Sequence, residues 1–243
     1  MQSDRESSRP TEKPAQAGVG QKADDAGNHH DDTPETAGPV PDDATDTDLA
    51  GDAGSDTSRL FFAWQPDAAV LEQLAGWQQR LARSRQLDQG VRWFGAGQLH
   101  VTALFLGEVA TELVEELGHC AATAIEASGL KPPTIELDQL AFFPRRSRPR
   151  VLVLAGEATG MLKAWHRALR QAVLELVPAV ERPLPFKPHV TLGRMTAHKA
   201  AGAKLPRVRQ PLAWRAGPLV LMESRIEPGG TVHATRWSQP PPQ

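Results

Sequence analysis

Residues 99–106 read Leu-His-Val-Thr-Ala-Leu-Phe-Leu, and residues 188–192 read Pro-His-Val-Thr-Leu. Both segments are apolar and rich in residues that favour strands, and each contains a histidine two positions before a threonine. Side chains alternate between the two faces of a strand, so the histidine and threonine of each segment share one face. The valine between them points to the other face. The sequence therefore predicts two strands, each with a polar face that carries His and Thr and an apolar face that joins a core.

The two predicted strands together carry four polar residues, which are His100, Thr102, His189 and Thr191. A histidine pair supplies a general acid and a general base near neutral pH, because the unperturbed pKa of imidazole is about 6.5. Hydroxyl donors beside the pair stabilise charge that builds up on a phosphate. One such segment is a weak signal that an ordinary surface histidine explains as well. Two copies on apolar strands favour metal-free acid–base chemistry.

The charge of the chain changes sign along its length. The first 58 residues hold 14 Asp and Glu, 4 Lys and Arg and no aromatic residue, which gives a net charge of −10. Such a composition buries too little apolar surface to fold alone, so we expect residues 1–58 to be a disordered acidic tail. Residues 59–239 are long enough for one domain with a sizeable core, and the chain after residue 58 has a net charge of +8. This charge suits a polyanion such as RNA, and an ordinary solvated surface explains it equally well.

Apolar periodicity predicts an α+β fold for residues 59–239. Helices are expected over residues 67–81, 113–124 and 162–176, and strands over 59–64, 91–94, 99–106, 135–143, 150–155, 188–192, 219–226 and 232–237. We expect Gly107-Glu108 to end the strand before it, and residues 135–143 and 150–155 to form a hairpin. The element order, with one His-Val-Thr strand in each half, indicates two α/β lobes related by approximate duplication around a central cleft.

The residues quoted above resemble the two-histidine (2H) phosphoesterase superfamily. More narrowly, the chain is similar to the bacterial and archaeal RNA 2′,3′-cyclic phosphodiesterases, historically called 2′-5′ RNA ligases. The resemblance covers residues 59–238 and rests on the two His-Val-Thr segments and on flanking stretches at 59–63, 107–108, 143, 150–154, 193–194, 221–225 and 229–230. It implies two pseudo-two-fold related lobes whose antiparallel sheets flank a cleft. The chain differs where the family often carries a tyrosine after the Gly-Gly turn, because His233 stands there.

The resemblance implies metal-independent hydrolysis of an RNA 2′,3′-cyclic phosphate to a 2′-phosphomonoester, with 2′-5′ ligation as the reverse reaction. One histidine would activate water and the other would protonate the departing 3′ oxygen. We take His189 as the base and His100 as the acid, although the pseudo-two-fold arrangement leaves the two roles exchangeable. Thr102 and Thr191 would donate hydrogen bonds to the phosphate. Arg194 would neutralise its charge.

Arg194 fits this scheme only if its strand is irregular. On a regular strand Gly193, and not Arg194, shares the face of His189 and Thr191, so the arginine needs a bulge or a strand end. We also expect Arg150 and Phe186 to contact RNA, with packing in the core as an equally good explanation of Phe186.

Several familiar motifs are missing from the sequence. The glycine pair 229–230 lacks the Lys-Ser/Thr of a phosphate-binding loop, so ATP use is not indicated. Cys120 is the single cysteine, which excludes an internal disulfide and a cysteine metal cluster, and we expect it to be buried on a helix. The N-terminus lacks the apolar region of a secretory signal, and no apolar run reaches membrane-spanning length. We therefore expect a cytoplasmic monomer that uses no metal or cofactor.

Two alternative interpretations remain open. The first keeps the chemistry and changes the substrate to a small cyclic nucleotide, an ADP-ribose cyclic phosphate or a 2′-5′ linkage. The second is a non-catalytic RNA-binding module that uses the same surface. Histidine and threonine are intact in both segments, which favours an enzyme, because binding alone needs cations more than imidazoles.

Overall fold

The computed structural model describes residues 56–239, apart from 85–86, 88–89, 146–147, 182–184, 197–202 and 229, and apart from the side chains of residues 145–148. Nearly all of the predicted acidic tail therefore lies outside the described residues. The first strand already includes Thr57 and Ser58, the last two residues of that predicted tail.

Ten strands and three α-helices make up the described part of the chain. The strands are β1 (Thr57–Trp64), β2 (Val91–Trp93), β3 (Val101–Ala110), β4 (Thr134–Leu137), β5 (Gln139–Arg145), β6 (Arg148–Ala155), β7 (His189–Met195), β8 (Leu212–Arg215), β9 (Leu219–Glu227) and β10 (Gly230–Ser238). The helices are α1 (Ala68–Ala82), α2 (Val114–Ser128) and α3 (Gly160–Val173), with short 3₁₀ turns η1 (Ala96–Gln98), η2 (Thr111–Leu113) and η3 (Pro178–Glu181).

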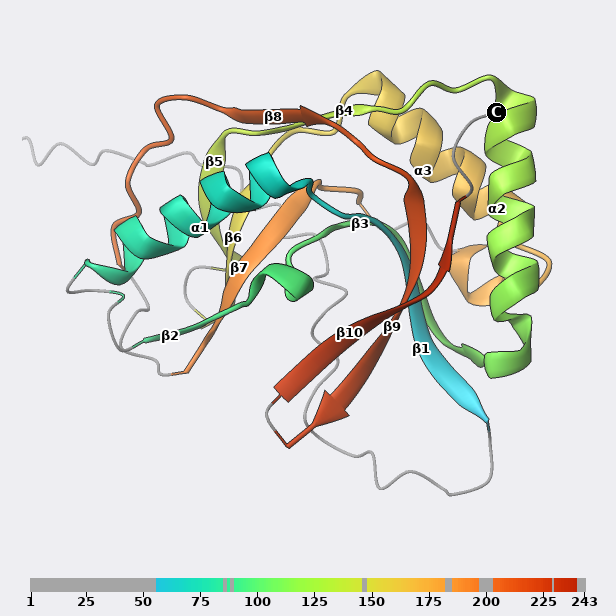
Figure 1. Cartoon of the computed structure of the whole chain (residues 1–243), viewed down its shortest axis with the longest axis horizontal. Coiled ribbons are helices and arrows are strands. Elements are labelled where there is room, and N and C mark those ends of the chain that lie inside the picture. The colour runs from blue at the N-terminus through green and yellow to red at the C-terminus, as the bar shows by residue number, and fades with distance from the viewer. Residues whose placement is uncertain are drawn as a thin grey trace, which may run out of the picture. The chain divides into compact units, whose positions relative to one another are not determined.

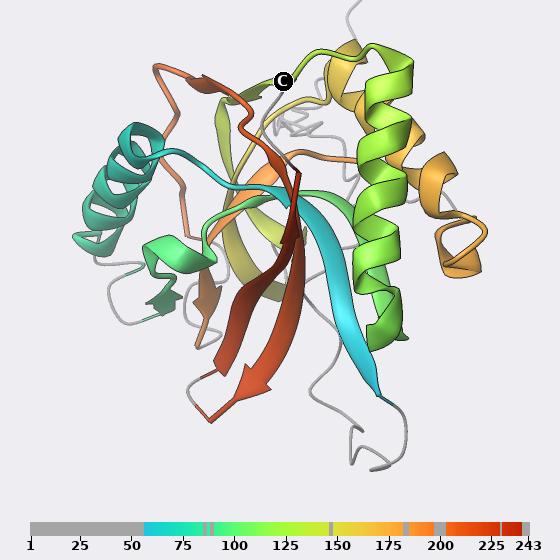
Figure 2. The same ribbon diagram turned by 45° about the vertical axis from the view of Figure 1, so that its right-hand side comes forward.

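The main sheet consists of two antiparallel lobes that meet at one residue pair. Its strand order is β10-β9-β1-β3-β7-β6-β5, and β2 also pairs with β7. Strands β3 and β7 are paired only between Val101 and Val190. We call β10, β9, β1 and β3 lobe one, and β2, β7, β6 and β5 lobe two; Figures 1 and 2 show the two sets of strands. This arrangement confirms the predicted two-lobed α+β fold, and lobe one combines the first strand with the last two.

The helices pack on one face of this sheet and enclose the main core. Helices α2 and α3 lie against each other, with α2 contacting β9 and β10 and α3 contacting β3 (Figure 1). The helices bury residues at helical spacing, as the sequence predicts: Val70, Leu74 and Leu81 on α1, Leu117 and Ala121 on α2, and Leu162, Trp165 and Leu169 on α3. Ile125, just beyond the predicted helix 113–124, is also buried. Asp67 and Thr159 cap α1 and α3 by accepting hydrogen bonds from backbone N–H groups.

The prediction that Gly107-Glu108 ends the strand is wrong. Strand β3 continues to Ala110, because Leu106 is the extra residue of a β-bulge against β1. Gly107 has a φ of 83°, a conformation that glycine adopts without a steric penalty. A glycine in a strand therefore marks a bulge here and not an end.

The predicted hairpin is also only partly correct. Residues 135–143 belong to two strands, because β4 ends at Leu137 and pairs with the unpredicted strand β8 in a separate two-stranded sheet. Only β5 pairs with β6. Cys120 is partly exposed and not buried, since the packed face of α2 runs through its neighbours Leu117 and Ala121.

Glu223 on β9 is a buried carboxylate that ties three strands of lobe one together. Its residue is 6% exposed, and it accepts hydrogen bonds from Ser58 on β1, from Arg225 on β9 and from Arg236 on β10. The hydrogen bond from Arg225 is the largest cause that lowers the pKa of Glu223, with help from Arg236 and Ser58 and against the opposing effect of burial.

Folding lowers the pKa of the Glu223 carboxyl from 4.5, so its ionised form stabilises the folded protein at pH values above 4.5. This stabilisation is lost as the pH falls from 4.5 through the lower pKa of the folded state. We expect Glu223→Gln to lower the free energy of unfolding by about 1–3 kcal/mol at pH 7. The difference from wild type should shrink below pH 4.5. Urea unfolding at pH 7, 5 and 3.5 measures this, with the exposed Glu157→Gln as the control. A difference that stays constant with pH contradicts the assigned role.

Candidate active site

The pairing of Val101 with Val190 brings the two His-Val-Thr segments together. Both valines are 0% exposed and belong to the main core, so the residues that flank them point to the opposite face of the sheet. The antiparallel register sets His100 across from Thr191 and Thr102 across from His189. We call this side of the two lobes the site face. It gathers all four residues that the motif predicts.

The two histidines are held in the same way. His100 Nδ1 lies 2.8 Å from the carbonyl oxygen of Gln98, and His189 Nδ1 lies 2.8 Å from the carbonyl oxygen of Lys187. A carbonyl oxygen only accepts hydrogen bonds, so each Nδ1 carries the hydrogen and donates it. In the neutral ring the lone pair then lies on Nε2, which is the nitrogen suited to take up or deliver a proton.

Each histidine ring also packs against a phenylalanine. The ring centroids of Phe61 and His100 are 4.9 Å apart, and those of Phe143 and His189 are 5.0 Å apart. These phenylalanines belong to two small apolar clusters that are separate from the main core, one on each lobe. The phenylalanine contact and the Nδ1 hydrogen bond together restrict each ring to one orientation. Such preorganisation favours catalysis because little conformational entropy is then lost on reaching the transition state.

Arg194 reaches the site face through a bulge in β7. Leu192 is the extra residue between the two paired stretches of β7 and β6. Beyond it, Arg194 pairs with Val151, and Val151 packs with Phe143 in the apolar cluster of lobe two. Cross-strand partners point to the same side of a sheet, so the bulge returns Arg194 to the face of the histidines. The irregularity that the sequence analysis required is therefore present.

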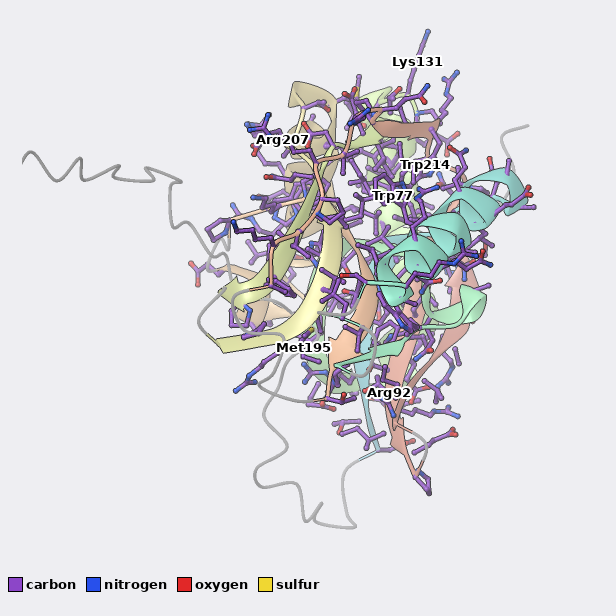
Figure 3. The ribbon with its side chains drawn as sticks, turned by 90° about the vertical axis from the view of Figure 1, so that its left-hand side faces the viewer. Trp77, Arg92, Lys131, Met195, Arg207 and Trp214 are labelled. Atoms are coloured by element: carbon purple, nitrogen blue, oxygen red, sulfur yellow. The ribbon has the colours of Figure 1, made fainter. Side chains whose placement is uncertain are left out.

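Gly193 allows a further arginine to approach. A Cβ atom at Gly193 would lie 2.7 Å from the backbone oxygen of Arg92 and 2.7 Å from Val91 Cγ1, so only glycine lets β2 pair at this point. Arg92 pairs directly with Arg194 and shares its face. Its guanidinium lies against Gly230 at the start of β10, where a Cβ would overlap it. Figure 3 labels Arg92. Arg92 thus reaches from lobe two to lobe one.

Arg92 and Lys187 were not among the residues that the sequence predicted for the site, and His233 was named there without a role. The Nζ atom of Lys187 lies 5.9 Å from the centroid of the Phe143 ring. The ring of His233 lies 5.0 Å from that of His100 and 5.2 Å from that of Phe61. Only His233 gave a sequence signal, because it replaces the tyrosine of the resembled family. The positions of Arg92 and Lys187 near the histidines follow only from the pairing of the strands.

Phe186, one of the two predicted RNA contacts, is not gathered with the motif residues. Arg150 is exposed and is the extra residue of a bulge between β5 and β6. Phe186 stacks on His166 of α3, with ring centroids 4.9 Å apart, and packs against the main core. Burial lowers the pKa of His166, which also bonds the backbone oxygen of Ala103. This placement favours the packing explanation of Phe186, and contact of either residue with RNA stays a prediction.

The site face combines two imidazoles, two threonine hydroxyls and two guanidinium groups around one junction of strands. This set can bind an anion and move protons on either side of it. Within the described ranges, no three His, Cys, Asp or Glu residues are grouped so that they could hold a metal ion. None of the described helices has the length and apolar character needed to cross a membrane.

Comparison with known proteins gives consistent matches. The family model of the 2′-5′ RNA ligase superfamily matches residues 66–225. An RNA 2′,3′-cyclic phosphodiesterase of Thermus thermophilus is 38% identical over 144 residues, which cover 56% of this chain and 68% of the relative. The crystal structure of TT0787 from Thermus thermophilus aligns with a TM-score of 0.55 and 31% identity over 74% of this chain and 96% of that one. The structure of E. coli LigT complexed with 3′-AMP aligns with a TM-score of 0.56 and 25% identity over 75% of this chain and 98% of that one.

The hydrogen bonds of the two histidines predict their tautomers. Long-range ¹H–¹⁵N spectra recorded above the titration range should show His100 and His189 protonated at Nδ1, with assignments from His100→Gln and His189→Gln. His119, exposed on α2, serves as the control and should average over both tautomers. Protonation of His100 or His189 at Nε2 contradicts the described geometry.

Proposed function

The chain belongs to the 2′-5′ RNA ligase superfamily, and from this we propose that it hydrolyses 2′,3′-cyclic phosphate ends of RNA to 2′-phosphomonoesters, with His100 and His189 as the acid–base pair. The observation that carries the proposal is the Val101–Val190 pair, which places two equally anchored imidazoles on one face. The 38% identical Thermus relative carries the name RNA 2′,3′-cyclic phosphodiesterase, which supports this reaction and substrate.

The proposed reaction moves one proton through each histidine. One Nε2 takes a proton from water as the water oxygen attacks the phosphorus, and the other Nε2 donates a proton to the 3′ oxygen as the P–O3′ bond breaks. The phosphate stays on the 2′ oxygen. The hydrogen bond from each Nδ1 to a carbonyl oxygen keeps the ring aligned and stabilises its charged form. One histidine ends protonated and the other neutral, and proton exchange with solvent restores the starting state.

We assign His189 as the base and His100 as the acid. Lys187 and Arg194 lie on the chain segment of His189, two residues before it and five residues after it. Cations on this segment would help to hold the phosphate beside His189, the histidine that the resemblance assigns as the base. The 2′-5′ ligation that the family name implies would run the same steps in reverse, with the roles exchanged.

Thr102, Thr191 and Arg194 are the proposed phosphate ligands. Thr191 is 4% exposed, so its hydroxyl is held in a largely dry environment where a hydrogen bond to an anion is strong. Arg194 would place its charge beside the non-bridging oxygens, on which negative charge increases as water attacks. These donors bind and orient the phosphate between the two imidazoles, which is why the proposed reaction needs no metal ion.

A smaller substrate is the second candidate. E. coli LigT has been crystallised with 3′-AMP, a mononucleotide with phosphate on the 3′ oxygen, and this supports a site that recognises a single terminal nucleotide. We propose RNA as the main substrate because the chain after residue 58 is basic, with a net charge of +8. Independence from ATP, a cytoplasmic location, a monomeric state and a separate acidic tail over residues 1–58 remain part of the proposal.

Both histidines should be required for turnover. We expect His100→Ala and His189→Ala each to lower kcat for a short RNA with a 2′,3′-cyclic phosphate end by about 10²–10⁴-fold in the presence of EDTA, because each removes a proton-transfer group. Product analysis should show a 2′-phosphate with wild type. Affinity for the 2′-phosphorylated product should change little in either variant.

His119→Ala is the matched control and should retain the wild-type rate, since His119 is an exposed residue on α2. A 3′-phosphate product would contradict the proposed bond cleavage. Full activity in either site variant would remove that histidine from the mechanism. A wild-type protein that binds the RNA without turnover would favour the binding-module interpretation.

A further inference from the structure

A groove separate from the site face runs between α1 and the segment 203–213. Its volume is about 1190 Å³, and its walls are the side of α1 from Glu72 to Ser84 and the residues that lead from Lys204 into β8. Figure 3 labels Trp77 on α1 and Arg207 on the facing segment. The proposed reaction uses none of the residues that line this groove.

The groove is basic and contains an aromatic platform. Arg80, Lys204, Arg207 and Arg209 line it together with a single carboxylate, that of Glu72. The guanidinium carbon of Arg80 lies 4.4 Å from the centroid of the Trp77 ring, so a flat cationic surface lies on the indole. Proteins that bind single-stranded nucleic acid combine cations along the backbone with planar groups on which bases stack. This groove has both features.

Both walls of the groove are close in sequence to the strands of the site face. Six residues lie between Ser84 on one wall and Val91, and six lie between Thr196 at the end of β7 and Ala203 before the other wall. Such a connection spans at most about 25 Å. Val91 pairs with Met195, and the next pair along these strands is Arg92 with Arg194 on the site face. The walls of the groove therefore lie close enough to the proposed phosphate ligands for one RNA strand of several nucleotides to reach both.

We propose that this groove binds single-stranded RNA on the 5′ side of the cyclic end. The groove would contact the upstream nucleotides while the site face binds the terminal phosphate. The inference rests on the proposed function and adds a second contact region to it. The acidic N-terminal segment offers charge complementarity too, but it has no Trp, Tyr or Phe, and its only rings are the imidazoles of His29 and His30. RNA matches both the charge and the platform.

The test compares a long and a minimal substrate in the full-length protein. The double variant Arg207→Gln/Arg209→Gln removes two exposed cations from the groove, and Lys163→Gln/Arg167→Gln removes two exposed cations from α3 as the control. We expect the groove variant to raise KM about tenfold for an RNA of about 12 nucleotides with a cyclic end. It should also reduce the slope of log KM against log salt by about 1. Kinetics with a mononucleotide 2′,3′-cyclic phosphate should not change.

Three results would overturn the groove assignment. An unchanged KM for the long RNA, or equal effects on both substrates, would show that the groove does not hold the RNA body. A lower KM for the long RNA would indicate that the groove holds the acidic segment in competition with RNA. Fluorescence anisotropy with the 2′-phosphorylated RNA tests the groove even if wild type turns over neither substrate, an outcome that would contradict the proposed function alone.

Discussion

The pairing of Val101 with Val190 is the contact on which the site depends. It is the single point at which β3 and β7 pair, and it joins two lobes that otherwise form separate antiparallel sheets. Both valines are fully buried, and their burial forces the flanking His and Thr residues to the opposite face. Displacing either strand by one residue would reverse the faces, sending the histidines into the core and the valines to the site. The hydrophobic core therefore fixes the register of the proposed catalytic groups.

Local pattern was sufficient to predict the centre of the site and insufficient for its edges. Strand alternation placed His and Thr of each segment on one face, because the face to which a strand side chain points follows from its position in the sequence alone. It also showed that Arg194 requires an irregular strand, and the Leu192 bulge provides it. Arg92 escaped detection because its position depends on the pairing of β2 with β7, which involves residues about a hundred positions apart.

The errors in the predicted fold have the same origin. The sequence of residues 135–143 predicts one continuous strand. In the structure it forms two strands, β4 paired with β8 and β5 paired with β6. Strand β8 is only four residues long, which is too short to predict a strand without β4 beside it. Gly107 predicts a strand end, whereas in the structure it pairs with Leu60 of β1 beside a bulge and the strand continues. Long-range pairing decided each of these cases.

The pH dependence of kcat/KM for an RNA with a 2′,3′-cyclic phosphate end, measured in EDTA, tests the central claim most directly. The account predicts a bell-shaped profile, because one imidazole must be neutral and the other protonated for the proton transfers to occur. It predicts that the profile is unaffected by added divalent metal. A monotonic profile, or activity that disappears with chelator and returns with metal, would contradict a paired-histidine mechanism at this site.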